Sequence, residues 1–366
     1  MQNFKVDLGD ACYETIIEDG LLKKLDELLD SYNLNGNVYI ICDELIAKKY
    51  NVKNLLSGYG ENYSLYIVPG QKNNKTFYSA MKIFEDLDNK NISRDSTIVA
   101  IGGGVIGDMS AYIAACWYRG VSLVHVPTTL LSAVDSCLGG KAALNFRNTV
   151  NAIGLYYHPS LIIIDTELIK ELPAREISSG FGEIIKYSFI SKNEIFDEIS
   201  NLKKGELSTL DRIITLCLKQ KIEFVNGDIK EAGDRLFLNF GHTIGHAIEF
   251  STIYEGEEMY RHGEGVGLGM IAIFHICIKL GYLTNGDLTI LLNLLDKYNL
   301  PTHVSASSLG LTRNQLIDRV VKIAFKDKKR TSAGLRLILL NGKGNPIIYN
   351  TTDPELIRSG VKEIVV

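Results

Sequence analysis

The fold is decided by the stretch Thr97-Ile-Val-Ala-Ile-Gly-Gly-Gly-Val-Ile-Gly-Asp108, in which a β-branched run leads into a glycine-rich turn and a second apolar segment. This pattern is typical of a strand that turns directly into a helix, where bare backbone amides can receive a pyrophosphate. Gly102, Gly104 and Gly107 fit the spacing G-x-G-x-x-G. Asp43 ends an earlier strand-like run and is suited to bind a ribose, although the acidic residue of the usual fingerprint follows the glycines. The stretch therefore predicts a dinucleotide site of non-standard order.

Similar apolar runs recur on both sides of this stretch. Candidate helices over residues 75–87 and 108–118 lie between them, and this alternation is the rhythm of βαβ units and a parallel sheet. Residues 1–172 are therefore predicted to form a Rossmann-like, doubly wound α/β domain. Its strands are expected at Val38–Cys42, Ser64–Val68, Thr97–Ile101, Ser122–Val126 and Leu161–Asp165.

The pattern changes after Leu172-Pro173 to long helical periodicity. Residues 173–366 are therefore predicted to form a mostly helical metal- and substrate-binding domain, with a hairpin of residues 335–340 and 346–349 near its end. We expect a cleft between the two domains, where cofactor and substrate sites commonly lie. The helices are expected over residues 176–190, 207–226, 239–250, 265–280 and 287–298.

Composition narrows the class of partner. The 366 residues are 46% hydrophobic and 22% charged with a net charge of −4, and the basic residues are scattered, which argues against nucleic acid or an anionic membrane as partner. The uncharged apolar run Gly265–Ile278 is too short to span a bilayer and reads as a buried helix. The start lacks a signal pattern, and six cysteines without a C-x-x-C pair suggest a reduced, cytoplasmic protein. A small-molecule partner is expected.

Three histidines and a glutamate predict a metal site. If the stretch Asn239–Phe250 is helical, His242 and His246 stand four residues apart on one face. His262 and Glu183 are the further candidates, and a zinc ion held by two histidines and one glutamate would keep an open position for chemistry. A lone histidine in an apolar run is more often a core residue. Clustering between glycines is what favours a metal for these histidines.

A second polar cluster follows the strand ending at Val126. It comprises Thr128, Thr129, Asp135, Lys141 and then Asn151. Hydroxyl, carboxylate, ammonium and amide groups together are suited to bind a polyhydroxylated anion.

Taken in order, these motifs resemble those of the 3-dehydroquinate synthase family. The resemblance runs through nearly the whole chain, and a set of this length is highly specific. It implies an NAD-binding α/β domain followed by a helical metal domain. The motifs that carry it are Gly102–Asp108, Arg119-Gly120, Pro127–Leu131, Asp135–Lys141, Leu172–Glu176, Gly180–Lys186, Asn239–His246, His262–Glu264 and Asp327–Lys329.

The resemblance also implies a reaction. Members of the family close 3-deoxy-D-arabino-heptulosonate 7-phosphate into 3-dehydroquinate with loss of phosphate, a step of the shikimate pathway to aromatic amino acids. NAD oxidises the substrate, phosphate is eliminated, the ketone is reduced again, and the opened ring closes by an intramolecular aldol step. The protein chiefly binds anions, holds the metal and orients the chain.

The roles implied by the resemblance are assigned residue by residue. Glu183, His242 and His262 would ligate the metal, usually zinc with cobalt as an alternative, while His246 would lie near the substrate phosphate. Glu231 would be the proton acceptor, and Arg119 would reach the site from a second subunit, which implies a homodimer. The remaining residues are Lys141, Asn151, Lys328 and Lys329 for phosphate, Lys221 and Arg235 for carboxylate, Asn239, Asp135 and Lys186 for other polar groups, and Asp43, Lys75, Gly103, Gly104, Val105, Asp108, Thr128 and Thr129 for NAD.

Two departures from the family pattern keep other functions open. Val150-Asn151 stands where the family has Lys-Asn, and Gly70-Gln71 begins a loop where the family has Gly-Glu-x-x-Lys. The alternatives are another sugar phosphate cyclase, a metal-dependent polyol dehydrogenase with net exchange of NAD and NADH, or a protein that binds without catalysis. Lys221 and Arg235 favour a substrate with a carboxylate, because buried charges without partners are costly.

Overall fold

The computed structural model describes residues 2–9, 11–55, 62–147, 149–254, 257–326, 330–331 and 334–366, so Lys328 and Lys329 lie outside the described residues. The chain divides into two compact units. The first comprises Met1–Leu172 with Leu210–Ile229, and the second comprises Pro173–Thr209 with Lys230–Val366. Each unit is described by itself below.

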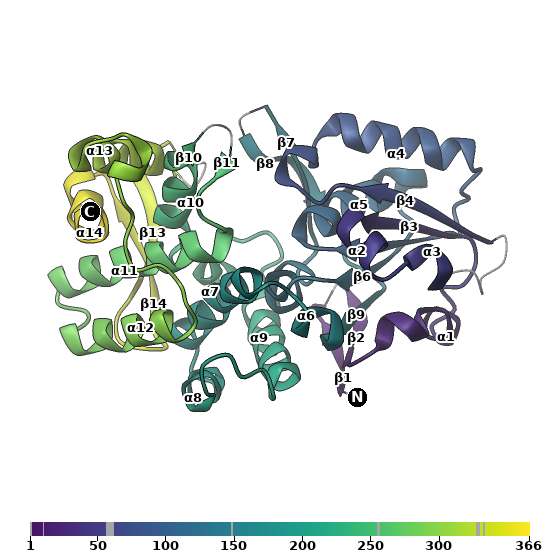
Figure 1. The fold of residues 1–366 in the computed structure, drawn as a ribbon, viewed down its shortest axis with the longest axis horizontal. Coiled ribbons are helices and arrows are strands. Elements are labelled where there is room, and N and C mark those ends of the chain that lie inside the picture. The colour runs from purple at the N-terminus through teal and green to yellow at the C-terminus, as the bar shows by residue number, and fades with distance from the viewer. Residues whose placement is uncertain are drawn as a thin grey trace. The chain divides into compact units, whose positions relative to one another are not determined.

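A seven-stranded sheet forms the centre of the first unit (Figure 1). Every neighbouring pair is parallel except the N-terminal hairpin of β1 and β2, which the sequence patterns did not predict. The five predicted strands are confirmed to within two residues at each end. In sheet order the strands are β1 (Gln2–Asp7), β2 (Cys12–Glu18), β9 (Leu161–Asp165), β6 (Ser122–Pro127), β5 (Thr97–Gly102), β3 (Val38–Asp43) and β4 (Tyr63–Val68).

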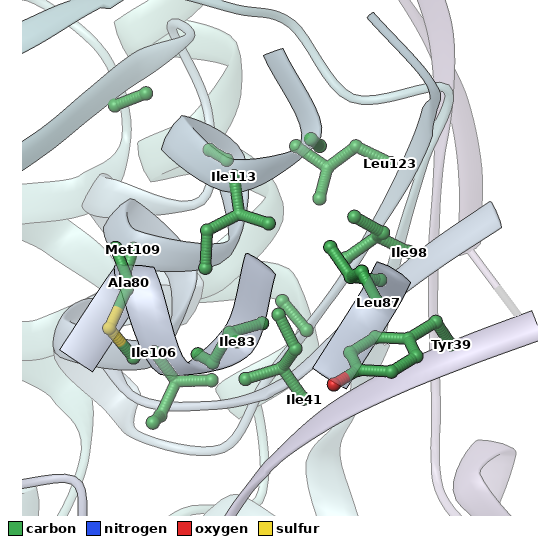
Figure 2. Packing of buried hydrophobic residues seen from close by; sticks show 14 of the residues in the cluster. Tyr39, Ile41, Ala80, Ile83, Leu87, Ile98, Ile106, Met109, Ile113 and Leu123 are labelled. Carbon is green, nitrogen blue, oxygen red and sulfur yellow. The ribbon is translucent and has the colours of Figure 1, made fainter. Parts of the chain in front are cut away.

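Helices cover both faces of this sheet, which explains why β5 is buried along its whole length. On one face, α4 (Phe77–Asn89) and α5 (Gly104–Cys116) pack their apolar sides against Tyr39, Ile41 and Ile98, as Figure 2 shows. On the other face, Val38 and Ile40 pack with the residues of α1 (Leu25–Ser31). The two apolar layers confirm a doubly wound α/β architecture. The short helices α2 (Glu44–Lys49), α3 (Val52–Leu55), α6 (Thr166–Lys170), η1 (Leu21–Lys24), η3 (Lys72–Asn74) and η4 (Trp117–Arg119) complete its connections, together with a hairpin of β7 (Lys141–Phe146) and β8 (Thr149–Tyr156).

The strand order reverses between β3 and β5. The chain passes from β3 outward to β4, and then returns to β5 and continues in the other direction to β6. In open α/β sheets, ligands bind outside the carboxyl ends of the strands at such a switch point. Asp43, Gly102 and Pro127 are the last residues of β3, β5 and β6, so the fold brings the predicted dinucleotide residues to one edge of the sheet.

One helix departs from the predicted division of the chain into residues 1–172 and 173–366. Helix α9 (Leu210–Val225) packs with the first unit, although it follows Pro173 by many residues. Gln2 donates to Asp211 at 2.8 Å and accepts from Thr215 at 2.5 Å, so β1 ties down this helix. Helical periodicity shows which face of a helix is apolar but not which domain covers it, and the sequence could not reveal this exchange.

The second unit is mainly helical and confirms the predicted helices there with small shifts at their ends. A three-stranded antiparallel sheet of β12 (Arg330–Thr331), β13 (Gly334–Leu340) and β14 (Pro346–Thr351) contains the predicted hairpin. In the described part of the chain, no helix has the length and apolar character needed to cross a membrane. The helices are α7 (Ala174–Ile190), α8 (Ile195–Asn201), α10 (His242–Ser251), α11 (His262–Lys279), α12 (Asn285–Lys297), α13 (Arg313–Ala324) and α14 (Pro354–Ile364), with the turns η6 (Asp234–Asn239) and η7 (Ser307–Leu309) and a ribbon of β10 (Ile253–Tyr254) and β11 (Glu257–Glu258).

Candidate active-site residues

The glycine-rich turn is held by close contacts with the segment that follows β6. The amide of Thr128 donates to the carbonyl of Gly102 at 3.0 Å. A Cβ atom on Gly103 would lie 3.1 Å from the Cγ2 atom of Thr129, so a bare backbone fits this turn best. Helix α5 begins at Gly104 and has no side-chain cap, which leaves its first amides available for an anion.

Asp43 lies at the neighbouring strand end and is held in place on two sides. Its Oδ1 atom caps α2 by accepting from the amide of Leu45 at 2.8 Å. Its Oδ2 atom occupies the space beside Gly70, where a Cβ atom would stand only 1.8 Å away. Burial raises the pKa of this carboxyl, although two backbone amides of α2 oppose the shift. The fold therefore presents a partly desolvated carboxylate where a ribose hydroxyl would find an acceptor.

Lys75 joins two predicted binding residues that the sequence placed on separate motifs. Its buried ammonium pairs with the Oδ2 atom of Asp108 on α5 and donates to the Oδ1 atom of Asn151 at 2.6 Å. The amide of Asn151 in turn donates to the Oδ1 atom of Asn145 at 3.0 Å. Since the Asn151 side chain accepts through its Oδ1 atom, its side-chain nitrogen Nδ2 remains oriented to donate, as a phosphate ligand must.

Asp135 and Lys221 form a second buried pair in this unit. Asp135 lies in the π-helical turn η5 (Ser132–Ser136), and such turns occur frequently at functional sites. The Lys221 ammonium lies 2.8 Å from the Asp135 Oδ1 atom and donates to the Asp135 carbonyl at 2.5 Å. Helix α9 thus brings its lysine to the polar cluster after β6. The predicted residues Lys141 and Arg119 are exposed.

The predicted metal residues of the second unit are brought together by three helices that touch at glycines. A Cβ atom on Gly182 of α7 would stand 2.2 Å from the carbonyl oxygen of Gly263 of α11. A Cβ atom on Gly245 of α10 would stand 2.7 Å from the carbonyl oxygen of Gly265. Such spacings allow the backbones to approach more closely than side chains would permit. This contact places the residue following Gly182, which is Glu183, opposite the histidines of α10 and α11.

The distances at this centre suit a single divalent ion. The Oε1 atom of Glu183 lies 3.2 Å from the Nε2 atoms of both His242 and His262. Two ligand atoms that each lie about 2.0–2.2 Å from a tetrahedral zinc are separated by about 3.4 Å. The ligand nitrogens of His242, His246 and His262 also lie within 4.8 Å of one another.

The electrostatics of the centre also favour a cation. Both carboxylate oxygens of Glu183 are buried, and neither accepts a hydrogen bond of ordinary geometry from the described residues, although the Lys186 ammonium lies 2.6 Å from Oε2. Burial works to raise the pKa of Glu183, but the charge of Lys186 and the adjacent rings of His242 and His262 outweigh it and hold that pKa well below its usual range. Burial lowers the pKa of His242, which favours the neutral ring that binds metals. The donor set therefore fits a divalent metal.

Other predicted residues of this unit lie nearby in the chain and contact one another. The Nδ2 atom of Asn239 donates to the Oε1 atom of Glu231 at 2.7 Å. Arg235, between them, is almost fully buried, and Lys186 donates to the carbonyl of Leu238 at 3.1 Å. Segment 231–239 therefore lies against the helix that carries Glu183.

Two of the predicted residues adopt strained backbone conformations. Arg119 has φ 66° and Glu231 has φ 60°, in the left-handed region where a residue other than glycine or asparagine is uncommon. Such strain costs on the order of 1–3 kcal/mol and clusters at functional sites. Both conformations agree with the roles expected of these residues.

The sequence patterns missed several supporting residues. Glu249 and the carbonyl of Phe240 contact the metal-site histidines, and Gly70 makes room for Asp43. Arg175 of α7 binds both oxygens of Glu264, at 2.7 and 2.8 Å. The spacing of Glu249, three residues after His246, was the one signal available, since it indicates the same face of a helix.

Comparison with known proteins agrees with this architecture. A family model described as 3-dehydroquinate synthase N-terminal matches residues 65–179, and its C-terminal counterpart matches residues 180–330. The 3-dehydroquinate synthase of Rippkaea orientalis is 36% identical over 97% of this chain and 96% of its own. That of Methylococcus capsulatus is 35% identical over 98% of both. Among solved structures, a 2-deoxy-scyllo-inosose synthase complexed with carbaglucose-6-phosphate, NAD+ and Co2+ matches with a TM-score of 0.84, at 26% identity and over 99% of both chains.

A parallel sheet with a glycine-rich turn and a helical unit with a carboxylate-histidine centre define a protein of the sugar phosphate cyclase fold. Within that class, the sequence matches identify the family. The chain belongs to the 3-dehydroquinate synthase family.

Proposed function

We propose that this protein is a 3-dehydroquinate synthase that converts 3-deoxy-D-arabino-heptulosonate 7-phosphate to 3-dehydroquinate and phosphate in the shikimate pathway. The observation that carries the proposal is the placement of one Glu183 oxygen 3.2 Å from both His242 and His262, in a chain that belongs to this family. The reaction needs a cation at such a site, because the carbon of a secondary alcohol gives up hydride poorly unless its hydroxyl group is polarised.

The metal ligands are Glu183, His242 and His262, and the ion is zinc or cobalt. The Oε1 atom of Glu183 lies 3.2 Å from the Nε2 atoms of both His242 and His262, and the ring centroid of His246 lies 5.4 Å from those of the other two histidines. When bound, the metal supplies polarisation of the substrate hydroxyl and carbonyl groups. His246 is left to contact the substrate phosphate, and Lys186 balances the charge of the buried Glu183.

NAD is the cofactor and lies at the carboxyl edge of the sheet. Its pyrophosphate is received by Gly103, Gly104 and Val105 at the start of α5, beside Thr128 and Thr129. Asp43 would accept from a ribose hydroxyl, and Asp108 and Lys75 would complete the NAD site. The ammonium of Lys75 donates to Asn151, which directly follows Val150.

The substrate anions are held by basic side chains. Lys221 and Arg235 bind the carboxylate, and both cations are buried. Lys141, Asn151, Lys328 and Lys329 bind the phosphate. Asp135 and Asn239 orient the hydroxyl groups.

Few side chains transfer protons in the proposed reaction. Glu231 accepts the proton that is removed before phosphate leaves, and Asn239 holds its carboxylate through the 2.7 Å hydrogen bond. The departing phosphate shares this work. Because NAD is reduced and reoxidised within one cycle, the protein has no need to release NADH, and positioning supplies most of the catalysis.

The protein acts as a homodimer in the cytoplasm. Arg119 contributes to the site of a second copy, which agrees with its exposed side chain and strained backbone. None of the six cysteines forms a disulfide, which is typical of a reducing compartment. Sedimentation equilibrium would test the dimer, and a monomer with full activity would contradict this role of Arg119.

A substrate panel tests the proposal against the other cyclases. Purified protein with NAD and zinc is given the heptulosonate 7-phosphate, a heptulose 7-phosphate without carboxylate, and glucose 6-phosphate. We expect a cyclic product from the first alone, and Arg235→Met should lower kcat/KM for it by about 100-fold, in line with losing one partner of a buried charge. Turnover of a substrate without carboxylate, unaffected by Arg235→Met, would favour a different cyclase.

A further inference from the structure

Glu249 is a buried carboxylate that contacts a metal-site histidine and has no assigned role. It lies on α10, three residues after His246, and only 7% of its surface is exposed. Its Oε1 atom is 3.0 Å from the Nδ1 atom of His262, which lies on the neighbouring helix α11. The contact therefore links the two helices at the level of the proposed metal.

The backbone of α11 leaves room for this carboxylate. A Cβ atom on Gly265 would stand 2.8 Å from the Cγ atom of Glu249 and 3.0 Å from its Oε1 atom. Any side chain at position 265 would therefore displace Glu249 from His262. Since Gly265 also lies against Gly245, one glycine sets both the approach of the helices and the place of the carboxylate.

The two histidines that face Glu183 are held in the same way. His242 has its Nδ1 atom 3.0 Å from the carbonyl oxygen of Phe240, and His262 has its Nδ1 atom at the same distance from Glu249. In both rings this leaves the Nε2 atom, 3.2 Å from Glu183, as the free ligand. A backbone carbonyl or a carboxylate at Nδ1 is the usual partner that fixes the tautomer of a metal-binding histidine.

His262 needs such a partner more than His242 does. Its side chain is 25% exposed, against 11% for His242. Packing alone therefore restrains its ring less. A charged acceptor also makes the ring a stronger donor to a metal than a carbonyl would.

We propose that Glu249 is the positioning residue of the metal site, which orients His262 through Nδ1 so that its Nε2 atom binds the metal together with Glu183 and His242. This inference rests on the metal site proposed above. It assigns Glu249 no contact with substrate or NAD.

The test measures metal binding in the absence of substrate and NAD. Apo-protein is titrated with Co2+ at fixed pH against a chromophoric chelator, and the visible absorption of the bound cobalt reports its coordination. Glu249→Ala should weaken cobalt binding by about 10–100-fold and change the cobalt spectrum. Glu249→Gln keeps an oxygen acceptor without its charge and should give an intermediate loss with a spectrum close to that of the wild type.

Glu264→Gln is the matched control. Glu264 is as buried as Glu249 and lies two residues from His262, but it binds Arg175 and not an imidazole. We expect its cobalt affinity to stay within about threefold of the wild type, well inside the loss typical of an outer partner of a metal ligand. Far-UV circular dichroism of each variant verifies that the helical second unit is folded.

Two results would overturn the inference. Glu249→Ala with wild-type affinity and spectrum would show that His262 needs no carboxylate, and an equal loss in Glu264→Gln would trace the effect to general loosening of α11. If the wild-type protein itself binds no cobalt, the proposed metal site fails first and Glu249 loses its role with it. These outcomes differ in the wild-type titration, so the two failures are distinguishable.

Discussion

A Cβ atom on Gly263 would stand 1.7 Å from the carbonyl oxygen of Ser179, so helices α7 and α11 meet backbone to backbone one residue from His262. The same crossing includes Gly182, which directly precedes Glu183. The geometry of the proposed metal centre thus depends on residues that have no side chain.

Gly263→Ala should separate these helices and impair metal binding. No flexible side chain is available to move, because the atoms in the way belong to the backbone. Overpacking of this kind typically lowers the free energy of unfolding by about 1–3 kcal/mol. Because backbone atoms cannot move aside as a side chain can, we expect Gly263→Ala to lower it by about 3 kcal/mol or more. The melting temperature and the zinc content after dialysis measure both effects.

Gly286→Ala is the control for that substitution. Gly286 lies in the first turn of α12, and its nearest neighbour to a new Cβ atom would be the Thr284 Oγ1 atom at 3.5 Å, which is ordinary contact. We expect unchanged zinc content. If Gly263→Ala retained wild-type zinc content and melting temperature, the helix crossing would not be what forms the site.

Lys75→Met should destabilise the first unit and weaken NAD binding. It removes the ammonium from Asp108 and Asn151, and breaking a largely buried pair on one side costs about 3–5 kcal/mol. Adding Asp108→Asn should restore most of the stability, because the unpaired charge is gone, but not the NAD affinity. Trp117, the only tryptophan, lies in this unit and reports its unfolding in urea. A double variant no more stable than Lys75→Met would refute the pairing argument.

His125 should make the first unit sensitive to acid. It is buried in β6, and burial lowers its pKa from 6.5 to about 4. The unfolded chain therefore binds a proton below pH 6.5 that the native protein refuses, and stability falls as the pH drops from about 6.5 to about 4, with no further loss below. At pH 5.5 the loss amounts to about 1.4 kcal/mol. His125→Gln should remove this difference between pH 7.5 and 5.5 in urea unfolding followed by Trp117, and an unchanged pH slope would contradict the prediction.

Gly70→Ala should weaken NAD binding by at least about tenfold, or about 1.4 kcal/mol. The new methyl group would collide with the Asp43 Oδ2 atom and push the carboxylate away from its place beside α2. Isothermal titration with NAD measures the change. Gly36→Ala, whose Cβ atom would lie 3.4 Å from its nearest neighbour, provides the comparison and should bind NAD normally.

The sequence predicted those parts of the fold that have a strong local pattern. A β-branched run and a glycine turn predict the strand at Thr97–Gly102 and the helix that follows it, and the structure has both. The hairpin of β7 and β8 was missed, because most positions of β8 are exposed and only Ile153 and Leu155 form a short alternating apolar face. The membership of α9 in the first unit depends on long-range contacts with Gln2 and Asp135, which no local pattern encodes.

In the candidate site, too, local spacing could be predicted from the sequence and long-range contacts could not. Histidines four apart on a helix are visible in a sequence, so His242 and His246 could be placed together beforehand. The contact of Glu249 with His262 and the pairing of Lys75 with Asp108 join side chains from different elements, and only the folded backbone brings them within reach. Resemblance to a family supplied residue roles, but not these supporting contacts.

The most direct test of the account follows phosphate and NADH together. Purified protein is incubated with 3-deoxy-D-arabino-heptulosonate 7-phosphate, zinc and a small amount of NAD, with and without a chelator, while released phosphate and absorbance at the NADH band are recorded. The account predicts many phosphates released per NAD, no net NADH, and loss of release with the chelator. NADH that accumulates in step with substrate consumption would indicate a dehydrogenase, and the absence of phosphate release from this substrate would contradict the central claim.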